Sequence, residues 1–142
     1  MIFHRYKVFI SRWEIVLNVY GSVHAYEEYV ENAIEIDKDN LFEICSNLYV
    51  YFMPSNQPAQ LHPLDYPHML EGLQRVKTQI LQNTRFDKTI ITISSVEYDP
   101  CCMQEEAFIV GLMEWAAKAF AFSAPAIEVS FNAESNKYDF KF

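Results

Sequence analysis

Residues 98–106, YDPCCMQEE, place two adjacent thiols among carboxylates, as a metal or redox site could. A helix start would lower the thiol pKa values of Cys101 and Cys102, whereas the surrounding carboxylates oppose thiolate formation. No histidine follows closely enough to act as a base, and zinc sites use spaced cysteines such as C-x₂-C rather than an adjacent pair. The pattern therefore favours packed cysteines, and we expect no catalytic residue and no metal ligand here.

The other residues of this stretch have local structural roles. Asp99 followed by Pro100 predicts the start of a helix, with Tyr98 and Met103 spaced as a hydrophobic staple. Carboxylates in the first turn of a helix are stabilised by its dipole. The sequence thus predicts an acidic rim that a partner could bind, formed by Asp99, Glu105 and Glu106. If Glu105 were instead buried, it would be a candidate general acid.

A second ligand-like cluster, His62-x₂-Asp65-x₂-His68, lies at the end of a proline-rich stretch. Its spacing straddles a predicted helix start and does not line one helical face, so we expect a solvated loop rather than a metal site. Loops carry binding residues disproportionately often. We therefore keep His62, Asp65 and Tyr66 as candidate partner contacts.

The motifs of common enzyme classes are absent from the sequence. It has no glycine-rich phosphate loop, no G-x-S-x-G, no H-E-x-x-H and no nucleotide fingerprint. We predict that the protein is not an enzyme and has no cofactor. A small enzyme with scattered catalytic residues, and a structural or assembly subunit, remain the alternatives.

The charge indicates the kind of partner. The formal net charge is −8 and the pI is about 4.9, which disfavours nucleic acid and anionic membrane surfaces and favours a basic protein. Between residues 22 and 48, seven acidic residues stand against one lysine. Candidate contacts in this segment combine carboxylates with aromatic rings: Glu27, Glu28, Glu31, Tyr26 and Tyr29.

The sequence favours a cytoplasmic protein. Three cysteines give no disulfide framework, and the N-terminal residues lack the apolar centre of a signal peptide. The most apolar stretch, residues 107–122, is interrupted by Glu114 and Lys118 and is shorter than a membrane span needs. The oligomeric state is left open.

Hydrophobic periodicity predicts the elements of the N-terminal half. Residues 2–20 are ambiguous between helix and strand. Alternation and β-branched content favour strands over 2–10 and 13–20, with their pairing left open. Helical spacing of apolar residues predicts helices over 23–36 and over 40–52, the second capped by Asp39. A loop over 54–67 then leads to a surface helix over 66–83, with Asp65 as its N-cap and Pro67 in its first turn.

The C-terminal half reads more clearly. Residues 88–98 form the most convincing strand, and the apolar helix that follows should be buried between a sheet and another helix. Residues 126–142 predict a hairpin that turns near 134–136. We therefore predict one α+β domain over 1–142, in which a C-terminal β-α-β-β unit contributes to a mixed sheet covered by helices. The final strand is expected to join that sheet.

The ordered C-terminal segment TIITISSVEYDPCCMQEEAFIVGLMEWAAKAF, together with chain size, acidity and α+β pattern, resembles the immunity proteins of polymorphic-toxin and contact-dependent growth inhibition systems. The resemblance implies a cognate toxin domain, often a cationic nuclease, that tight binding neutralises. Carboxylates that mimic phosphates and aromatic anchors would supply such binding. The hypothesis from the sequence is a small acidic inhibitor of a basic protein.

Overall fold

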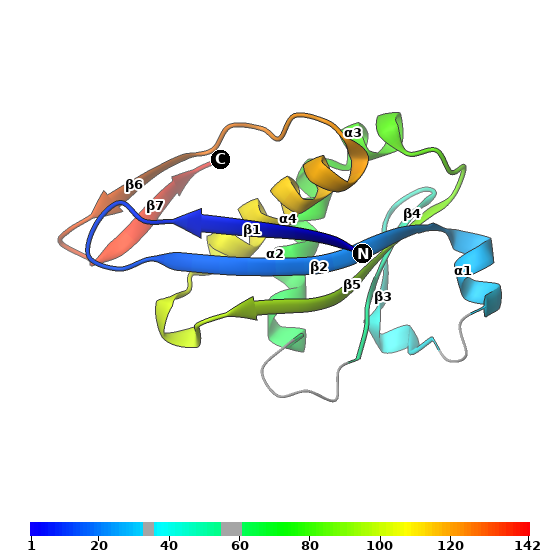
Figure 1. Ribbon diagram of the computed structural model, residues 1–142, viewed down its shortest axis with the longest axis horizontal. Helices are drawn as coiled ribbons and strands as arrows, with labels where there is room; N and C mark the ends of the chain where they lie inside the picture. The colour runs from blue at the N-terminus through cyan, green and yellow to red at the C-terminus, as the bar shows by residue number, and fades with distance from the viewer. Residues whose placement is uncertain (33–35, 55–60) are drawn as a thin grey trace.

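The computed structural model describes residues 1–32, 36–54 and 61–142 and contains a five-stranded mixed sheet (Figure 1). The strand order is β1-β2-β5-β4-β3. The bounds are β1 (Ile2–Val8), β2 (Ile15–Ala25), β3 (Leu41–Cys45), β4 (Leu48–Phe52) and β5 (Thr89–Tyr98). The pair β4 and β5 is parallel, and the other neighbouring strands are antiparallel. The predicted α+β domain with a mixed sheet is confirmed.

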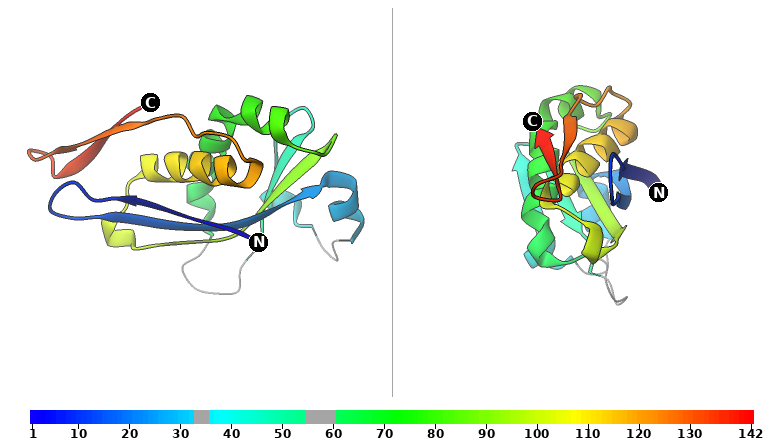
Figure 2. Two further views of the ribbon diagram at one scale, coloured as in Figure 1. Left: turned by 45° about the horizontal axis from the view of Figure 1, so that its top comes forward. Right: turned by 90° about the vertical axis from the view of Figure 1, so that its left-hand side faces the viewer.

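Helices cover one face of this sheet (Figure 2). These are α2 (Tyr66–Arg75), α3 (Lys77–Asn83) and α4 (Glu105–Phe120). The short helix α1 (Tyr26–Asn32) follows β2 directly and lies at one end of the sheet, against β2 and β5. The opposite face of β1, β2 and β5 carries a polar ladder in which Arg5 donates to Asn18 and Asn18 donates to Glu97.

Helix α4 is the centre of the core. It packs on β1, β2 and α2, and Trp115 is fully buried in it. The Trp115 indole lies over Gly21 of β2, where an added Cβ would come within 2.6 Å of the ring. Glycine lets the strand approach the ring this closely. The predicted burial of this helix between the sheet and another helix is confirmed.

The predicted strands over 2–10 and 13–20 are confirmed as the antiparallel pair β1 and β2. The helix predicted over 23–36 is wrong at its start, because β2 continues to Ala25 and pairs there with β5. Helix α1 occupies only 26–32, and positions 33–35 of the prediction lie outside the described residues.

The helix predicted over 40–52 is wrong. This segment forms the hairpin of β3 and β4, which turns at Ser46 and Asn47. Asn47 has φ 71°, a left-handed conformation that asparagine tolerates better than most residues and that suits a tight turn. Asp39 is not an N-cap; the cap of the short 3-10 helix Lys38–Asn40 is Asp37.

The helix predicted over 66–83 is divided at Val76 into α2 and α3, and Pro67 lies in the first turn of α2 as expected. Asp65 occupies the predicted N-cap position but makes no side-chain capping bond. Its carboxylate accepts a hydrogen bond from the Tyr98 hydroxyl instead. Of the loop predicted over 54–67, positions 55–60 lie outside the described residues.

The start of α4 also differs from the prediction. Asp99 and Pro100 begin a separate 3-10 helix, Pro100–Cys102, and α4 begins at Glu105. The Gln104 side chain bonds to both the backbone N–H and the carbonyl of Tyr138, so it joins the helix start to the C-terminal hairpin.

The predicted C-terminal hairpin is confirmed as β6 (Glu128–Asn132) and β7 (Lys137–Lys141). The expectation that its last strand joins the main sheet is wrong, because β6 and β7 form a sheet of their own. This hairpin lies beside the loop between β1 and β2 (Figures 1 and 2), where Trp13 packs edge-on against Tyr138.

Within the described ranges 1–32, 36–54 and 61–142, none of the helices has the length and apolar composition that crossing a lipid bilayer requires.

Candidate functional site

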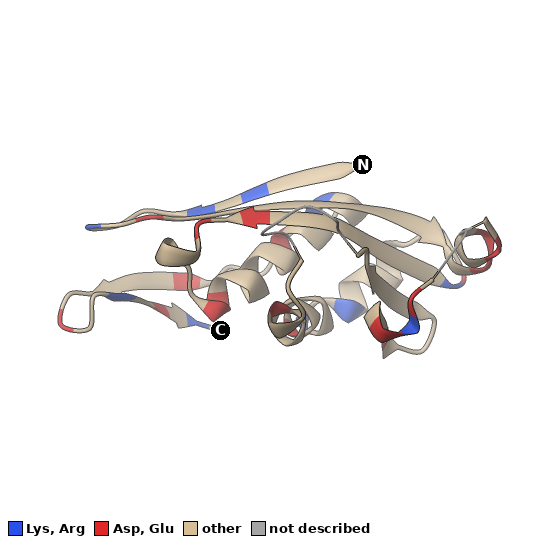
Figure 3. Cartoon of the chain, turned by 90° about the horizontal axis from the view of Figure 1, so that it is seen from below, with Lys and Arg blue, Asp and Glu red and all other residues tan. Residues whose placement is uncertain are grey.

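The acidic residues that the sequence singled out lie in two separate places. One group is carried by α1 and the 3-10 helix after it, at the right-hand end of the molecule in Figure 3. We call this group the α1 acidic surface; its five members are all exposed: Glu27, Glu28, Glu31, Asp37 and Asp39. The second group surrounds the start of α4, far from α1 along the sheet. The fold therefore does not merge the predicted contacts into one site.

Aromatic rings adjoin the α1 acidic surface. Tyr26 packs against Tyr49 of β4 with ring centroids 4.5 Å apart, and Tyr29 stacks on His24 at 5.0 Å. The Lys88 ammonium lies 4.1 Å from the centroid of the Tyr26 ring. Both predicted tyrosines are half-buried, so each presents part of a ring that is already held in place by its neighbour. Ordered aromatic rings of this kind bind a partner at low cost in side-chain entropy.

The carboxylates of the two groups differ in how they are engaged. Among the described residues, no basic side chain lies within ion-pair distance of Glu27, Glu28 or Glu31 on α1. At the other end, Glu105 lies 3.6 Å from the imidazole of His68, and Asp99 accepts a hydrogen bond from the backbone of Cys101. The glutamates of α1 are thus free to meet an external cation.

The start of α4 borders a shallow hollow against the β6–β7 hairpin. Glu105 and Glu106 line it together with Lys137 and Asp139. The Glu105 side chain is 75% exposed, which excludes the buried general-acid alternative. Here an acidic rim does exist, but Lys137 adds a positive charge inside it.

The adjacent cysteines have different surroundings. Cys101 is exposed, whereas Cys102 is partly buried beside it. Partial burial and then the Asp99 carboxylate raise the pKa of the Cys102 thiol. Its thiolate is therefore disfavoured near neutral pH, as the sequence pattern predicted.

The loop candidates have structural partners. The Nδ1 of His62 accepts a hydrogen bond from the backbone N–H of Leu64, and Asp65 accepts from Tyr98. Tyr66, which the sequence also offered as a candidate partner contact, is buried and does not fit that role. Its ring is 7% exposed and stacks on Phe52 at 4.2 Å, and its hydroxyl donates to Asn40. The Tyr66 ring is therefore part of the hydrophobic core.

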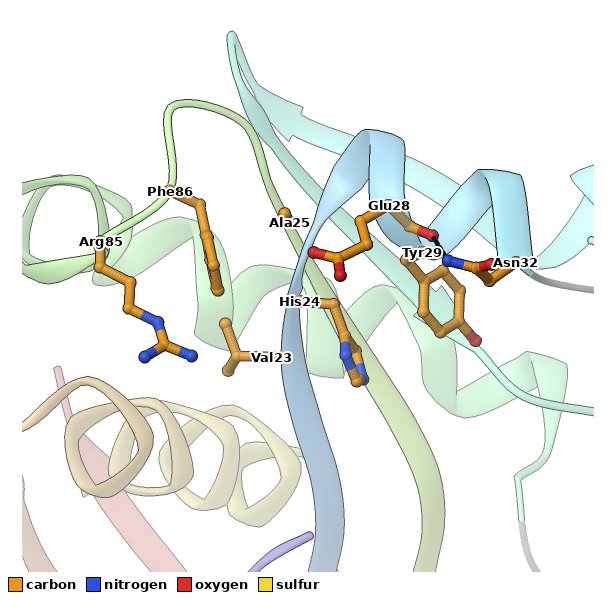
Figure 4. Close-up of a pocket in the computed structure, with 8 residues that line it drawn as sticks. All are labelled: Val23, His24, Ala25, Glu28, Tyr29, Asn32, Arg85 and Phe86. Atoms are coloured by element: carbon orange, nitrogen blue, oxygen red, sulfur yellow. Dashed lines mark hydrogen bonds between the residues drawn. The ribbon is translucent and has the colours of Figure 1, made fainter.

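A hollow of about 510 Å³ lies beside the α1 acidic surface, and no pattern in the sequence indicates it. In Figure 4, the side chains of Glu28 and Tyr29 from α1 and of His24 from β2 lie on one side of it. Arg85 and Phe86, from the connection between α3 and β5, lie on the other side. These segments are about sixty positions apart in the chain, so no local pattern could have joined them.

The groups in this hollow have a defined electrostatic character. Burial lowers the pKa of His24, so the ring is neutral at pH 7, and its Nε2 lies 2.9 Å from the Ser22 hydroxyl. The Arg85 guanidinium lies over the Phe86 ring and has no acidic side chain within 4.0 Å among the described residues. The hollow thus carries a negative group and a positive group on opposite sides, both available to a ligand.

Comparison with protein-family models, curated proteins and solved structures gives no match to this chain.

Proposed function

We propose that this protein is a small acidic inhibitor, similar to immunity proteins, that neutralises a basic partner such as a toxin nuclease by binding it through the α1 acidic surface. The observation that carries the proposal is the state of the glutamates on α1. Glu27, Glu28 and Glu31 are exposed and have no cationic partner within the described part of the chain, next to the ordered rings of Tyr26 and Tyr29.

Complementary charge supports binding of a basic partner at this surface. Carboxylates grouped at one end of a chain of net charge −8 attract a basic surface over several ångströms and raise its association rate. Where a nuclease binds phosphates, such carboxylates would meet the same basic side chains. Half-buried tyrosines beside them supply the apolar contact area that slows dissociation.

The experiment is coexpression with the product of a neighbouring toxin-like gene, followed by measurement of cell growth and of complex formation. The wild-type chain is expected to restore growth and to copurify with the toxin domain. The triple variant Glu27→Lys, Glu28→Lys, Glu31→Lys is expected to associate at least about tenfold more slowly at low salt, with the difference shrinking as salt is added.

The matched control reverses three carboxylates at the other end of the molecule, with Glu105→Lys, Glu106→Lys and Asp139→Lys. It changes the net charge by the same amount but leaves α1 intact. If both triple variants slow association equally, total charge matters and the α1 surface does not. Absence of both protection and binding with the wild-type chain would contradict the proposed function.

A further inference from the structure

The sheet has an open edge next to the α1 acidic surface. Strand β2 runs from Ile15 to Ala25, but β1 begins at Ile2, which pairs with Gly21. Residues 22–25 of β2 therefore have a strand neighbour, β5, on one side only among the described residues. All four are partly exposed. We call residues 22–25 the β2 open edge.

The register determines which backbone groups face this edge. The N–H of Tyr26 donates to the carbonyl of Lys88 in the ladder between β2 and β5. In an antiparallel ladder the hydrogen-bonding direction alternates from one residue to the next. His24 and Ser22 therefore direct their N–H and C=O groups toward β5, whereas Val23 and Ala25 direct theirs outward. Unpaired groups of this kind are a template for an added strand.

The outer edge of β1 is protected, because the Lys118 ammonium of α4 donates to the carbonyl of Phe3. Beside the β2 open edge, Met1 lines the same hollow as Ser22, Val23 and His24, and after burial its ammonium is the next cause of the lowered pKa of His24. Within the described chain, no side chain makes a comparable bond to the backbone of Val23 or Ala25. The edge also lacks the lysines and prolines with which proteins often block strand addition.

Two adjoining hollows border the β2 open edge and share Val23, His24, Arg85 and Phe86. The 510 Å³ hollow is also lined by Glu28 and Tyr29. The other, of about 450 Å³, is also lined by Ala119 and Phe120 of the helix layer. Figure 4 places Val23 beneath the Phe86 ring, with His24 directed to the opposite side.

From this arrangement we infer that the β2 open edge binds an extended segment of a partner protein as an additional antiparallel strand, with apolar residues alternating with basic ones. Apolar side chains opposite Val23 and Ala25 enter the hollow near Phe86. Basic side chains opposite His24 face Glu28 and the rest of the α1 acidic surface. Main-chain bonds supply affinity in this mode, and the alternating pockets supply specificity.

The inference rests on the proposed function in one respect, because the charge of the α1 acidic surface selects basic residues in the added strand. Arg85 adds a contact that does not depend on that selection. An added strand would leave the carbonyl oxygens on its outer side unpaired. The Arg85 guanidinium lies across the hollow from β2, and no described acidic residue pairs with its five N–H donors. Arg85 can therefore donate to those carbonyl oxygens.

The experiment uses residues 1–142 without an N-terminal tag, because tag residues ahead of Met1 would lie along the same edge. The probe is a capped hexapeptide of alternating valine and lysine. Amide hydrogen exchange is followed by NMR. In the free protein, the amides of Val23 and Ala25 are expected to exchange fast and that of His24 slowly. Addition of the peptide is expected to slow Val23 and Ala25 at least about tenfold.

Matched peptides separate strand pairing from charge attraction. Methylation of the valine amides blocks the bonds to β2, whereas methylation of the lysine amides leaves them intact, with equal net charge. The valine-methylated peptide is expected to bind at least about tenfold more weakly, since each methyl group removes a main-chain hydrogen bond to β2. Equal binding of the two methylated peptides would overturn strand addition while leaving the proposed function standing.

The reverse outcome is also distinguishable. If the triple variant of Glu27, Glu28 and Glu31 to lysine binds the peptide as the wild type does, while valine methylation still abolishes binding, strand addition stands and the proposed function fails. Val23 and Ala25 amides that are already protected in the free protein, together with a dimer in sedimentation, would show a second copy on this edge and overturn the inference. So would the absence of binding by the unmodified peptide.

Discussion

The hydroxyl of Tyr138 donates a hydrogen bond of 2.6 Å to the carbonyl oxygen of Trp13, although the two residues are 125 positions apart in the sequence. The Tyr138 hydroxyl oxygen in turn accepts a hydrogen bond from the backbone N–H of Ile10 at 3.0 Å. One phenol therefore completes the hydrogen bonding of the loop between β1 and β2, and it does so from the separate β6–β7 sheet. The Tyr138 side chain is 1% exposed, so water cannot replace it.

Replacement of this phenol tests its contribution to stability. Tyr138→Phe removes the hydroxyl and leaves the Ile10 N–H and the Trp13 carbonyl without their partner, which costs about 1–3 kcal/mol of unfolding free energy. Urea denaturation followed by circular dichroism measures the loss. Tyr49→Phe, on a half-buried ring, is the control and should change stability by less than about 0.5 kcal/mol. Equal effects of the two changes would contradict the role assigned to Tyr138.

Two glycines in helices test how closely the elements approach. A Cβ at Gly72 of α2 would collide with the backbone carbonyl of Ile109 in α4, whereas the one close approach of a Cβ at Gly111 is to the end of the Leu17 side chain, at 2.6 Å. Gly72→Ala should therefore destabilise the protein by about 1–3 kcal/mol, because a helix backbone must move.

Gly111→Ala should cost much less, since the Leu17 side chain can rotate and alanine favours the helix by about 1 kcal/mol over glycine. Thermal denaturation of both variants provides the comparison. A larger loss for Gly111→Ala than for Gly72→Ala would contradict the packing between α2 and α4 described above.

The cysteine pair should react unequally. Cys101 is exposed, while burial and the Asp99 carboxylate raise the pKa of Cys102. Alkylation by iodoacetamide at about pH 8, followed by peptide mass spectrometry, should label Cys101 first, because only the thiolate reacts. Asp99→Asn keeps an oxygen that can cap the 3-10 helix but removes the charge, so it should accelerate labelling of Cys102. An unchanged rate would contradict the contribution of the Asp99 carboxylate to the raised pKa of Cys102.

Stability should fall at alkaline pH. Burial and the hydrogen bond to Asp65 raise the pKa of Tyr98 to about 12, and burial also raises the pKa of Tyr6 and Tyr66. In the unfolded chain these phenols ionise near pH 10, so folding favours their protonated form. This contribution is complete below about pH 10 and is lost as the pH rises toward 12.

Urea midpoints measured between about pH 8 and pH 11 would show the fall. Tyr98→Phe removes one of the ionising groups and should make the midpoint less sensitive to pH over that interval. A wild-type midpoint that stays constant to pH 11 would contradict the prediction.

The sequence was sufficient for the elements with one dominant pattern. The β-branched run of β5 is compatible only with a strand and the wide apolar arc of α4 only with a buried helix, and both are found as predicted. The segment 40–52 is compatible with two structures, because Leu41, Ile44 and Leu48 fit a helix as well as a hairpin. Asn47 decides between them, since its left-handed conformation lets β4 return along β3 and then pair with β5, a long-range contact.

The candidate site was predictable only in part. The local sequence is enough to predict that the glutamates of α1 are exposed and that tyrosines lie beside them. Arg85 and Phe86 come to the same hollow only because α3 ends beside β2, and the open edge exists only because β1 starts one pair short of Ser22. Register and strand length are set by the whole sheet, which is why they leave no local signature.

The contacts of Tyr138 also bear on how the chain is made. The hairpin of β1 and β2 leaves the ribosome well before the groups that complete it, which belong to Glu114, Trp115 and Tyr138 and are synthesised more than a hundred residues later. At roughly 5–20 residues per second, the hairpin waits about 6–25 s for its last partner. During that interval the Trp13 ring lacks the Tyr138 ring that packs edge-on against it, so the hairpin of β1 and β2 is made early and completed late.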